Sequence, residues 1–314
     1  MLMLQSMTGP RAPISADAAN HPLRAALVRG ERAYADSAPA LRHLLAAVDH
    51  SLIGEAVVAQ VRGQLADLAR QLVGARSHGE AAGTVVEAML ARLVADADLS
   101  AHCQALALEW RLAQRLEAEQ AIDPVLSPAM QGWVAQADAA LGSLAMAALA
   151  AQARFAQAQR RMELPLAELP AELFHAALSA AREVIPDAAP DASPRGETLL
   201  RADYDEAASR LALLARLARE AAPLASRDLP IEEAGVALWL SILADGSGQS
   251  RDRTACAAAD THLGRLLLTL RAAGTPSAEA ERQALRIQPD AEIPRGLDDV
   301  STREATQWLA DTRA

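Results

Sequence analysis

The sequence contains no lysine, so all 30 of its basic residues are arginine, and Asn20 is its single asparagine. A P-loop needs a lysine on the phosphates of its nucleotide, and a pyridoxal enzyme needs a lysine that forms a Schiff base. The missing lysine therefore excludes both kinds of site. Asn20 is followed by His21 and Pro22, so the sequence also lacks an acceptor for N-glycosylation.

Aromatic residues are also scarce, at 3% of the chain, whereas hydrophobic residues make up 51%. The core must therefore consist of leucine, alanine and valine, and such small side chains favour closely packed helices. The two cysteines, Cys103 and Cys256, lie far apart, without the Cys-x-x-Cys spacing of a metal or redox site. They are predicted to be buried free thiols, and the sequence predicts neither a metal site nor a cofactor.

Basic residues are fewer than acidic residues, and the net charge is −10. Residues 1–185 carry 15 arginines against 19 acids, and residues 186–314 carry 15 against 21. Proteins that bind nucleic acid usually show a basic surplus or a basic stripe. Neither half has one, so we expect no nucleic-acid partner.

Long apolar runs and targeting signals are missing too. The first residues, MLMLQSMTGPRAP, have no charged segment ahead of a sufficiently long apolar run, as a signal peptide would. No stretch reaches the roughly 18 uninterrupted apolar residues that a membrane span needs. The sequence therefore predicts a soluble cytoplasmic protein that does not enter a membrane.

What the sequence does contain is helical periodicity over most of its length. Apolar residues recur at intervals of three and four, as in Val57, Val61, Leu65, Leu68 and Leu72. No alternating strand of useful length and no fixed-period repeat is present. We therefore predict an all-α fold, an array of roughly ten helices.

One predicted helix is much longer than the others. Ser127 and Pro128 are typical of a helix start, and the following apolar positions are spaced alternately by four and three residues: Met130, Val134, Ala137, Leu141, Leu144, Ala148, Ala151, Phe155, Ala158 and Met162. This heptad seam predicts one helix over about 128–163, roughly 54 Å long. The favoured interpretation packs the seam inside the chain's own bundle. A homodimer through residues 130–162 and the wall of a ligand site remain alternatives.

The domain organisation is predicted from proline and composition. Residues 1–20 are polar, contain two prolines, and are expected to be disordered. Residues 21–185 are predicted to form a helical bundle. Residues 186–196, PDAAPDASPRG, read as a linker or a long loop. Residues 197–314 are predicted to form a second helical subdomain that packs on the first.

Candidate chemistry is sparse. The segment DGSGQSRDR, residues 245–253, places Arg251 and Arg253 at the start of a helix, where an anion could bind. A solvated turn is the favoured interpretation, because no strand precedes the glycines. Asp203, Asp205 and Glu206 could bind a cation, but acids at a helix start ordinarily complement the helix dipole. The histidines form no zinc motif, and a Gly-x-Ser-x-Gly hydrolase elbow is absent.

Polar residues near the end of the long helix form the least ordinary group. Gln152, Gln159 and Arg160 could form a polar network inside a bundle or a docking face for an acidic partner, and Arg161 follows them directly. A solvated face is the usual place for such residues on a long helix. We therefore retain these four, with Arg251 and Arg253, as weak candidates for contacts with a partner or an anion.

The absence of any catalytic constellation favours a non-catalytic function, as a protein-interaction or regulatory scaffold with an unknown protein partner. The first alternative is a helical-bundle enzyme or a protein that binds a small ligand or metal, because a site in a bundle core is assembled from residues far apart in the chain. The second alternative is a transcriptional regulator.

Overall fold

The computed structural model describes residues 21–46, 54–77, 83–136, 139–186, 194–221 and 229–312. These segments form 14 α-helices and three short 3-10 helices, and no strand occurs among them. The prediction of an all-α fold is confirmed. The described residues hold more helices than the roughly ten expected, and the predicted long helix over 128–163 is broken.

The helices of the first half are α2 (Pro22–Ala46), α3 (Glu55–Arg76), α4 (Gly83–Val94), α5 (Ala97–Gln120), α6 (Pro128–Val134), α7 (Ala139–Arg160), η1 (Leu166–Glu168) and α8 (Ala171–Val184). Those of the second half are α9 (Pro194–Asp203), η2 (Glu206–Ala208), α10 (Arg210–Ala221), α11 (Ile231–Ser247), α12 (Arg251–Ala259), α13 (Gly264–Ala272), α14 (Ser277–Ile287), η3 (Leu297–Asp299) and α15 (Thr302–Asp311).

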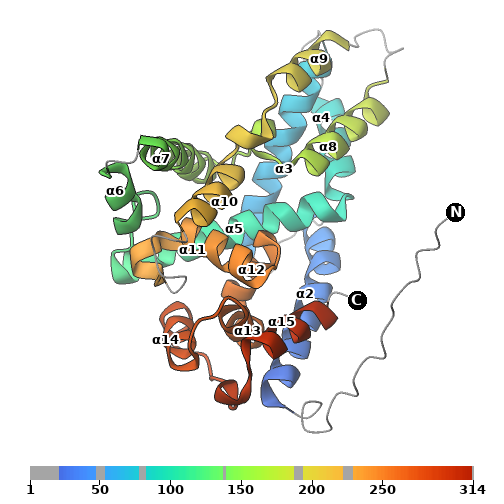
Figure 1. The fold of residues 1–314 in the computed structure, drawn as a ribbon. Coiled ribbons are helices and arrows are strands. Elements are labelled where there is room, and N and C mark those ends of the chain that lie inside the picture. The colour runs from blue at the N-terminus through green and yellow to red at the C-terminus, as the bar shows by residue number, and fades with distance from the viewer. Residues whose placement is uncertain are drawn as a thin grey trace, which may run out of the picture.

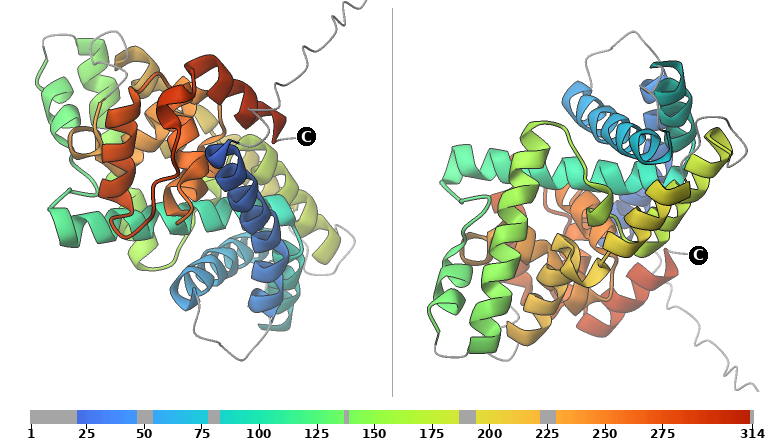
Figure 2. Two further views of the ribbon diagram at one scale, coloured as in Figure 1. Left: turned by 90° about the horizontal axis from the view of Figure 1, so that it is seen from below. Right: turned by 90° about the horizontal axis from the view of Figure 1, so that it is seen from above.

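Helix α5 runs through the middle of the molecule (Figures 1 and 2). It contacts α2, α3, α4, α7, α11 and α12. The side chain of Asp96 accepts a hydrogen bond from the N–H of Leu99 and so caps its first turn. A broad face of α5 is buried, because apolar residues occupy two neighbouring stripes of the helix. The central position of α5 means that charged residues on this face must find partners inside the protein.

The two halves share one hydrophobic core, which runs from Leu23 to Leu309. Helix α10 packs on α7, α9 packs on α3, and α13 packs on α2, so each of these contacts joins the first half to the second. Most of the predicted linker, residues 187–193, and the N-terminal residues 1–20 lie outside the described residues. The linker's last three residues, 194–196, begin α9.

The predicted single helix over 128–163 is wrong. Helix α6 ends at Val134 and α7 begins at Ala139, and the two pack against each other. A Cβ on Gly142 would lie 3.6 Å from the carbonyl oxygen of Trp133, so the glycine allows the end of α6 to approach α7 closely. The fold-back buries Met130 and Trp133. Two successive helices with the same periodicity produce a heptad pattern that continues across the break.

The seam itself faces the interior of the chain. Leu141, Leu144, Ala148, Ala151 and Phe155 are buried, and α7 contacts α10, α6 and α5. Ala137 lies outside the described residues, and Met162 is exposed. A second copy of the chain could not reach these buried positions while α10 remains in place. Helix α7 is the one described helix that is long and apolar enough to cross a membrane, but 44% of its most apolar window is buried, and core helices meet the same criterion.

The contact between α13 and α2 gives a direct test of the packing. A Cβ on Gly264 would lie 2.7 Å from the backbone of Ala26 and Leu27. We expect Gly264→Ala to lower the free energy of unfolding by about 1–3 kcal/mol, because the two helices must separate. The control is Gly132→Ala on α6, where a Cβ would meet nothing within 4 Å. Urea denaturation should show a lower midpoint for the first variant only; equal midpoints would contradict this packing.

Candidate functional site

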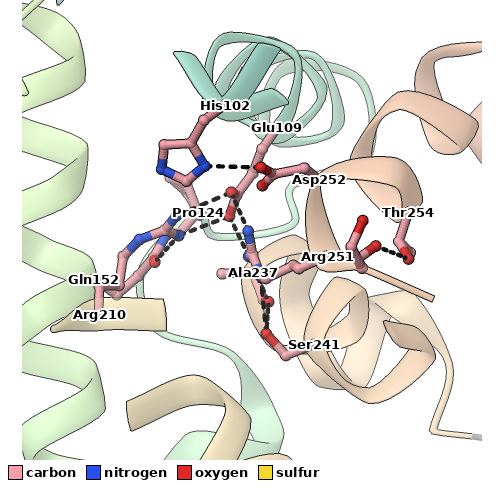
Figure 3. A network of polar contacts seen from close by, with 11 residues as sticks. His102, Glu109, Pro124, Gln152, Arg210, Ala237, Ser241, Arg251, Asp252 and Thr254 are labelled. Atoms are coloured by element: carbon pink, nitrogen blue, oxygen red, sulfur yellow. Dashed lines mark hydrogen bonds and ion pairs between the residues drawn. The ribbon is translucent and has the colours of Figure 1, made fainter. Parts of the chain in front are cut away.

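A buried carboxylate lies between two arginines at the centre of the fold (Figure 3). Glu109 of α5 is 2% exposed, and each of its two oxygens accepts one hydrogen bond from Arg210 and one from Arg251. Arg210 donates over 2.7 and 3.0 Å, and Arg251 donates twice over 2.7 Å. We call these three residues the Glu109 centre.

The remaining hydrogen bonds of the Glu109 centre extend into neighbouring helices. Arg251 donates from Nε to the hydroxyl of Ser241 and from Nη2 to the carbonyl of Ala237, each over 3.0 Å. Arg210 donates to the side-chain oxygen of Gln152 over 3.0 Å, and its guanidinium carbon lies 3.6 Å from the centroid of the Phe155 ring. The centre therefore ties α5, α7, α10, α11 and α12 together.

Each arginine is the first residue of its helix, which fixes its position. Arg210 begins α10, and its backbone N–H donates to the Glu168 carboxylate over 2.8 Å. Arg251 begins α12, where the Ser250 hydroxyl caps the helix by accepting from the N–H of Arg253. Both side chains then point back towards α5, whose buried face carries Glu109 (Figure 3).

The electrostatics of the centre keep Glu109 ionised. Burial alone raises the pKa of Glu109, but the charges of Arg210 and Arg251 and their hydrogen bonds outweigh it and hold this pKa far below its ordinary value. Burial lowers the pKa of Arg210, with Glu109 opposing the shift, whereas for Arg251 the attraction of Glu109 outweighs burial and raises the pKa. An ionised carboxylate has about four acceptor positions, and four are occupied here. Glu109 is therefore unsuited to exchange a proton with a substrate.

A histidine–aspartate pair lies beside the centre. His102 of α5 is 1% exposed, and its Nδ1 lies 2.8 Å from Oδ2 of Asp252 on α12. Its Nε2 is buried and has no hydrogen-bond partner among the described residues. An aspartate orients the catalytic histidine in this manner in hydrolases, but there the other nitrogen meets a nucleophile. Here the pair joins α5 to α12, and no side chain of the described residues bonds to Nε2.

The predicted contact residues between positions 152 and 161 fall into two environments. Gln152 and Gln159 are buried, and Oε1 of Gln159 accepts from the side chains of Gln60 and Gln64 over 2.9 and 2.7 Å. Gln152 donates to the carbonyl of Pro124 over 2.8 Å. Both glutamines therefore form hydrogen bonds inside the protein and are not solvated. Arg160 and Arg161 are exposed.

The two arginines predicted at the turn, Arg251 and Arg253, are separated by the fold. Arg251 belongs to the Glu109 centre. Arg253 lies near Glu31, with Nη1 3.6 Å from its carboxylate, and it lines a cavity beside α2. The segment 245–253 is therefore only partly a solvated turn, and the two arginines do not form one anion site. Both arginines lie on α12, which ends at Ala259, and Leu263, with a φ of 57°, precedes the separate helix α13.

Two members of the acidic group at 203–206 accept hydrogen bonds from backbone N–H groups. The Asp205 side chain accepts from the N–H of Ala207 over 3.0 Å, and Glu206 accepts from the N–H of Ala171 over 3.1 Å. Within the described ranges, no group of three or more histidine, cysteine or acidic side chains could hold a metal ion.

A second carboxylate is surrounded by arginines at the far end of α3. Glu197 of α9 accepts from Arg76 over 2.6 Å and from Arg201 over 3.0 Å, and it also pairs with Arg182 of α8. Arg76 is buried and donates to the carbonyl of Ile185 over 2.8 Å. Burial raises the pKa of Glu197, and its arginine partners lower it further than burial raises it. Both carboxylates therefore hold helices together in the same way.

Glu109 and Arg210 were not found from the sequence. The available signal was a single acid on the broad apolar face of α5, since Leu106 and Ala113 are buried three residues before it and four residues after it. Charged residues are almost never fully buried unless they are paired, so this position required a cationic partner. The partner could not be found in this way, because Arg210 lies 101 residues away.

The fold and the Glu109 centre define a class: an all-α protein whose buried charged groups hold the helices together. The comparisons name no relative within this class. No family model matches the chain, no curated protein is significantly similar to it, and no solved structure shows a significant match.

Proposed function

We propose that this protein is a non-catalytic interaction protein, and that the outer side of α7 binds an amphipathic helix of another protein. The observation that carries the proposal is an exposed apolar surface on a helix whose other side is in the core. Met146 is 51% exposed in the middle of this surface. We define the outer face of α7 by its exposed residues Ala140, Ser143, Met146, Ala147, Ala150 and Arg154.

The outer face is suited to another helix. Ala140, Ser143, Ala147, Ala150 and Arg154 follow one another at intervals of three and four, so they lie along one side of α7. Their side chains are small except for that of Arg154, and small residues allow two helix backbones to approach closely. A shallow groove of about 620 Å³ runs along this side and is also lined by Val134 and Gln136. Helices α6 and α7 lie at one edge of the molecule, where a partner has access (Figure 2).

The charge on this face selects the chemistry of the partner. Arg154 is exposed and has no ion-pair partner among the described residues, and Arg160 and Arg161 are exposed near the end of the same helix. Arg161 is paired with Glu163 over 2.7 Å. An isolated arginine at the end of an apolar stripe complements a helix that carries an apolar stripe followed by Asp or Glu.

The interior supports a non-catalytic role. The carboxylate of the Glu109 centre has all its acceptor positions occupied, and both thiols have pKa values raised by burial, that of Cys256 to about 12. A thiol with a raised pKa is a poor nucleophile at neutral pH. The Glu109 centre and the two thiols therefore support folding, and the outer face of α7 is an exposed apolar surface that could serve binding.

The proposal is tested by photocrosslinking in the cells that make the protein. A benzophenone amino acid is placed at Ala147 on the outer face, and a matched control probe is placed at Thr306, which is exposed on α15. We expect an adduct from position 147 alone, and mass spectrometry should identify the linked peptide as a helix with an apolar stripe and an acidic end. Arg154→Glu should reduce the adduct yield at least several-fold, because it places like charges together.

Other results would refute the proposal. No adduct at position 147, or equal adducts at both positions, would mean that no specific partner covers the face. An adduct to another copy of this chain would replace the helix of another protein by a homodimer. Flotation with phosphatidylglycerol–phosphatidylcholine vesicles that is lost in Ala147→Glu would show that the face binds a lipid surface.

A further inference from the structure

A separate cavity lies between α2, α5, α12 and the start of α13. Its volume is about 210 Å³, smaller than the roughly 300–1,000 Å³ typical of sites for drug-sized ligands. Leu108, Ala33 and Ala257 form an apolar part of its wall. Its ligand must therefore be small, and part of that ligand must be apolar.

One side of the cavity offers a hydrogen-bond donor that the protein does not use fully. Nη1 of Arg253 is buried and makes no hydrogen bond among the described residues, because the carboxylate of Glu31 lies 3.6 Å away. The guanidinium carbon of Arg253 is 5.5 Å from the ring centroid of Tyr34, which also lines the cavity. The Arg253 side chain as a whole is 26% exposed and lines the cavity, so its guanidinium can donate to a ligand oxygen there.

The opposite charge is also present in the wall. Asp260 lines the cavity, and a Cβ on Gly30 would lie 2.4 Å from its Oδ2, so this carboxylate lies directly against the backbone of α2. Asp260 also contacts His262 over 2.9 Å. Arg253 and Arg265 balance Glu31 and Asp260, so the formal charges of the side chains that line the cavity sum to zero.

This balance restricts the ligand. Glu31 is paired with Arg265. A simple anion would gain from Arg253 but would be repelled by Asp260, and a simple cation would meet the reverse arrangement. A molecule that carries both charges interacts favourably with both kinds of side chain. The other polar groups in the wall are neutral, since burial raises the pKa values of Tyr34 and of Cys256, the latter to about 12.

We infer that this cavity binds a free α-amino acid with an apolar side chain. The carboxylate of the amino acid accepts from Arg253, its ammonium group donates to Asp260, and its side chain contacts Leu108, Ala33 and Ala257. The site is distinct from the outer face of α7, because its walls come from α2, α5, α12 and α13. The inference therefore does not depend on the proposed protein partner.

The test is isothermal titration calorimetry of the whole protein at pH 7 with L-leucine, valine, isoleucine, methionine and phenylalanine. We expect saturable binding of at least one of them. Two analogues of leucine isolate its charges: 4-methylpentanoate lacks the ammonium group, and 3-methylbutylamine lacks the carboxylate. Each analogue should bind at least about tenfold more weakly than the amino acid from which it is derived, because one charged contact is lost. If another of the five amino acids binds best, its own analogues without the ammonium group or the carboxylate are used. These measurements use the unaltered protein and do not depend on a variant that folds.

Variants then assign the contacts. Arg253→Gln and Asp260→Asn should each weaken binding of the amino acid at least about tenfold. Arg253→Gln should leave the binding of 3-methylbutylamine unchanged, and Arg154→Gln on the outer face of α7 should leave amino-acid binding unchanged. Binding of none of the five amino acids would overturn the inference. It would also be overturned by an analogue that binds as tightly as its amino acid, or by variants at both positions that bind normally.

Discussion

Glu109→Gln is expected to lower the free energy of unfolding by about 3–5 kcal/mol, because two buried arginines would lose their common counter-charge. The glutamine keeps nearly the same shape, so the loss measures charge and hydrogen bonding and not a cavity. Arg210 is as deeply buried as Glu109, and solvent cannot easily replace the missing carboxylate. The measurement is the urea dependence of the far-ultraviolet circular dichroism of the variant and of the wild type.

The control for Glu109→Gln is Glu183→Gln at an exposed ion pair. Glu183 pairs with Arg92 over 2.6 Å, but the two side chains remain 58% and 37% exposed to solvent. Exposed pairs contribute little, so this variant should denature at nearly the same urea concentration as the wild type. Equal losses for the two variants would show that Glu109 has no special role. Replacing Glu109, Arg210 and Arg251 together by leucine and methionine should restore part of the stability.

The dependence of stability on acid pH is a second test of the Glu109 centre. The pKa of Glu109 is depressed in the folded protein and is about 4.3 in an unfolded chain. Its contribution is therefore fully present above about pH 4.3 and declines as the pH falls from there towards the folded-state pKa. Between about pH 5 and pH 2 the wild type should lose more stability than Glu109→Gln, so the two curves should converge. Parallel curves would mean that the carboxylate titrates normally.

The second large effect is expected from glutamates inside the seam of α7. Ala148→Glu together with Ala151→Glu should abolish folding, since both positions are fully buried and two unpaired carboxylates would enter the core. Size-exclusion chromatography and circular dichroism should find no folded protein at neutral pH. A folded monomer instead would mean that these residues form a subunit interface.

The same helix supplies a matched control one residue away. Ala147→Glu together with Ala150→Glu changes the same residue types by the same amount of charge, but both positions are exposed. This variant should remain folded with a denaturation midpoint close to that of the wild type, because glutamate is a good helix former. It should, however, give no adduct with the partner proposed for the outer face when the crosslinking probe is moved to Ser143, which is exposed on the same face. Unfolding of both double variants would remove the distinction between the two sides of α7.

The sequence predicted the all-α class because periodicity of three and four residues is a local property. It also identified which positions of α7 share one side, and the structure buries most of the described ones. It failed where helices end without a proline or a clear glycine signal. The break before Ala139 occurs within the continuous heptad pattern of residues 130–162. Local periodicity continues across such breaks, since each new helix repeats the same spacing.

The sequence by itself determined the helical class, the apolar composition of the core, and the exclusion of lysine chemistry, because these follow from residue types and their spacing. The tertiary structure alone decided that Gln152 and Gln159 are buried and that Glu109 lies between two arginines. It also decided that Arg251 binds Glu109 whereas Arg253 lines a separate cavity. The hydrogen bonds of the Glu109 centre join residues 101 and 142 positions apart. Contacts over such separations depend on how the helices pack in space, which periodicity along the chain does not encode.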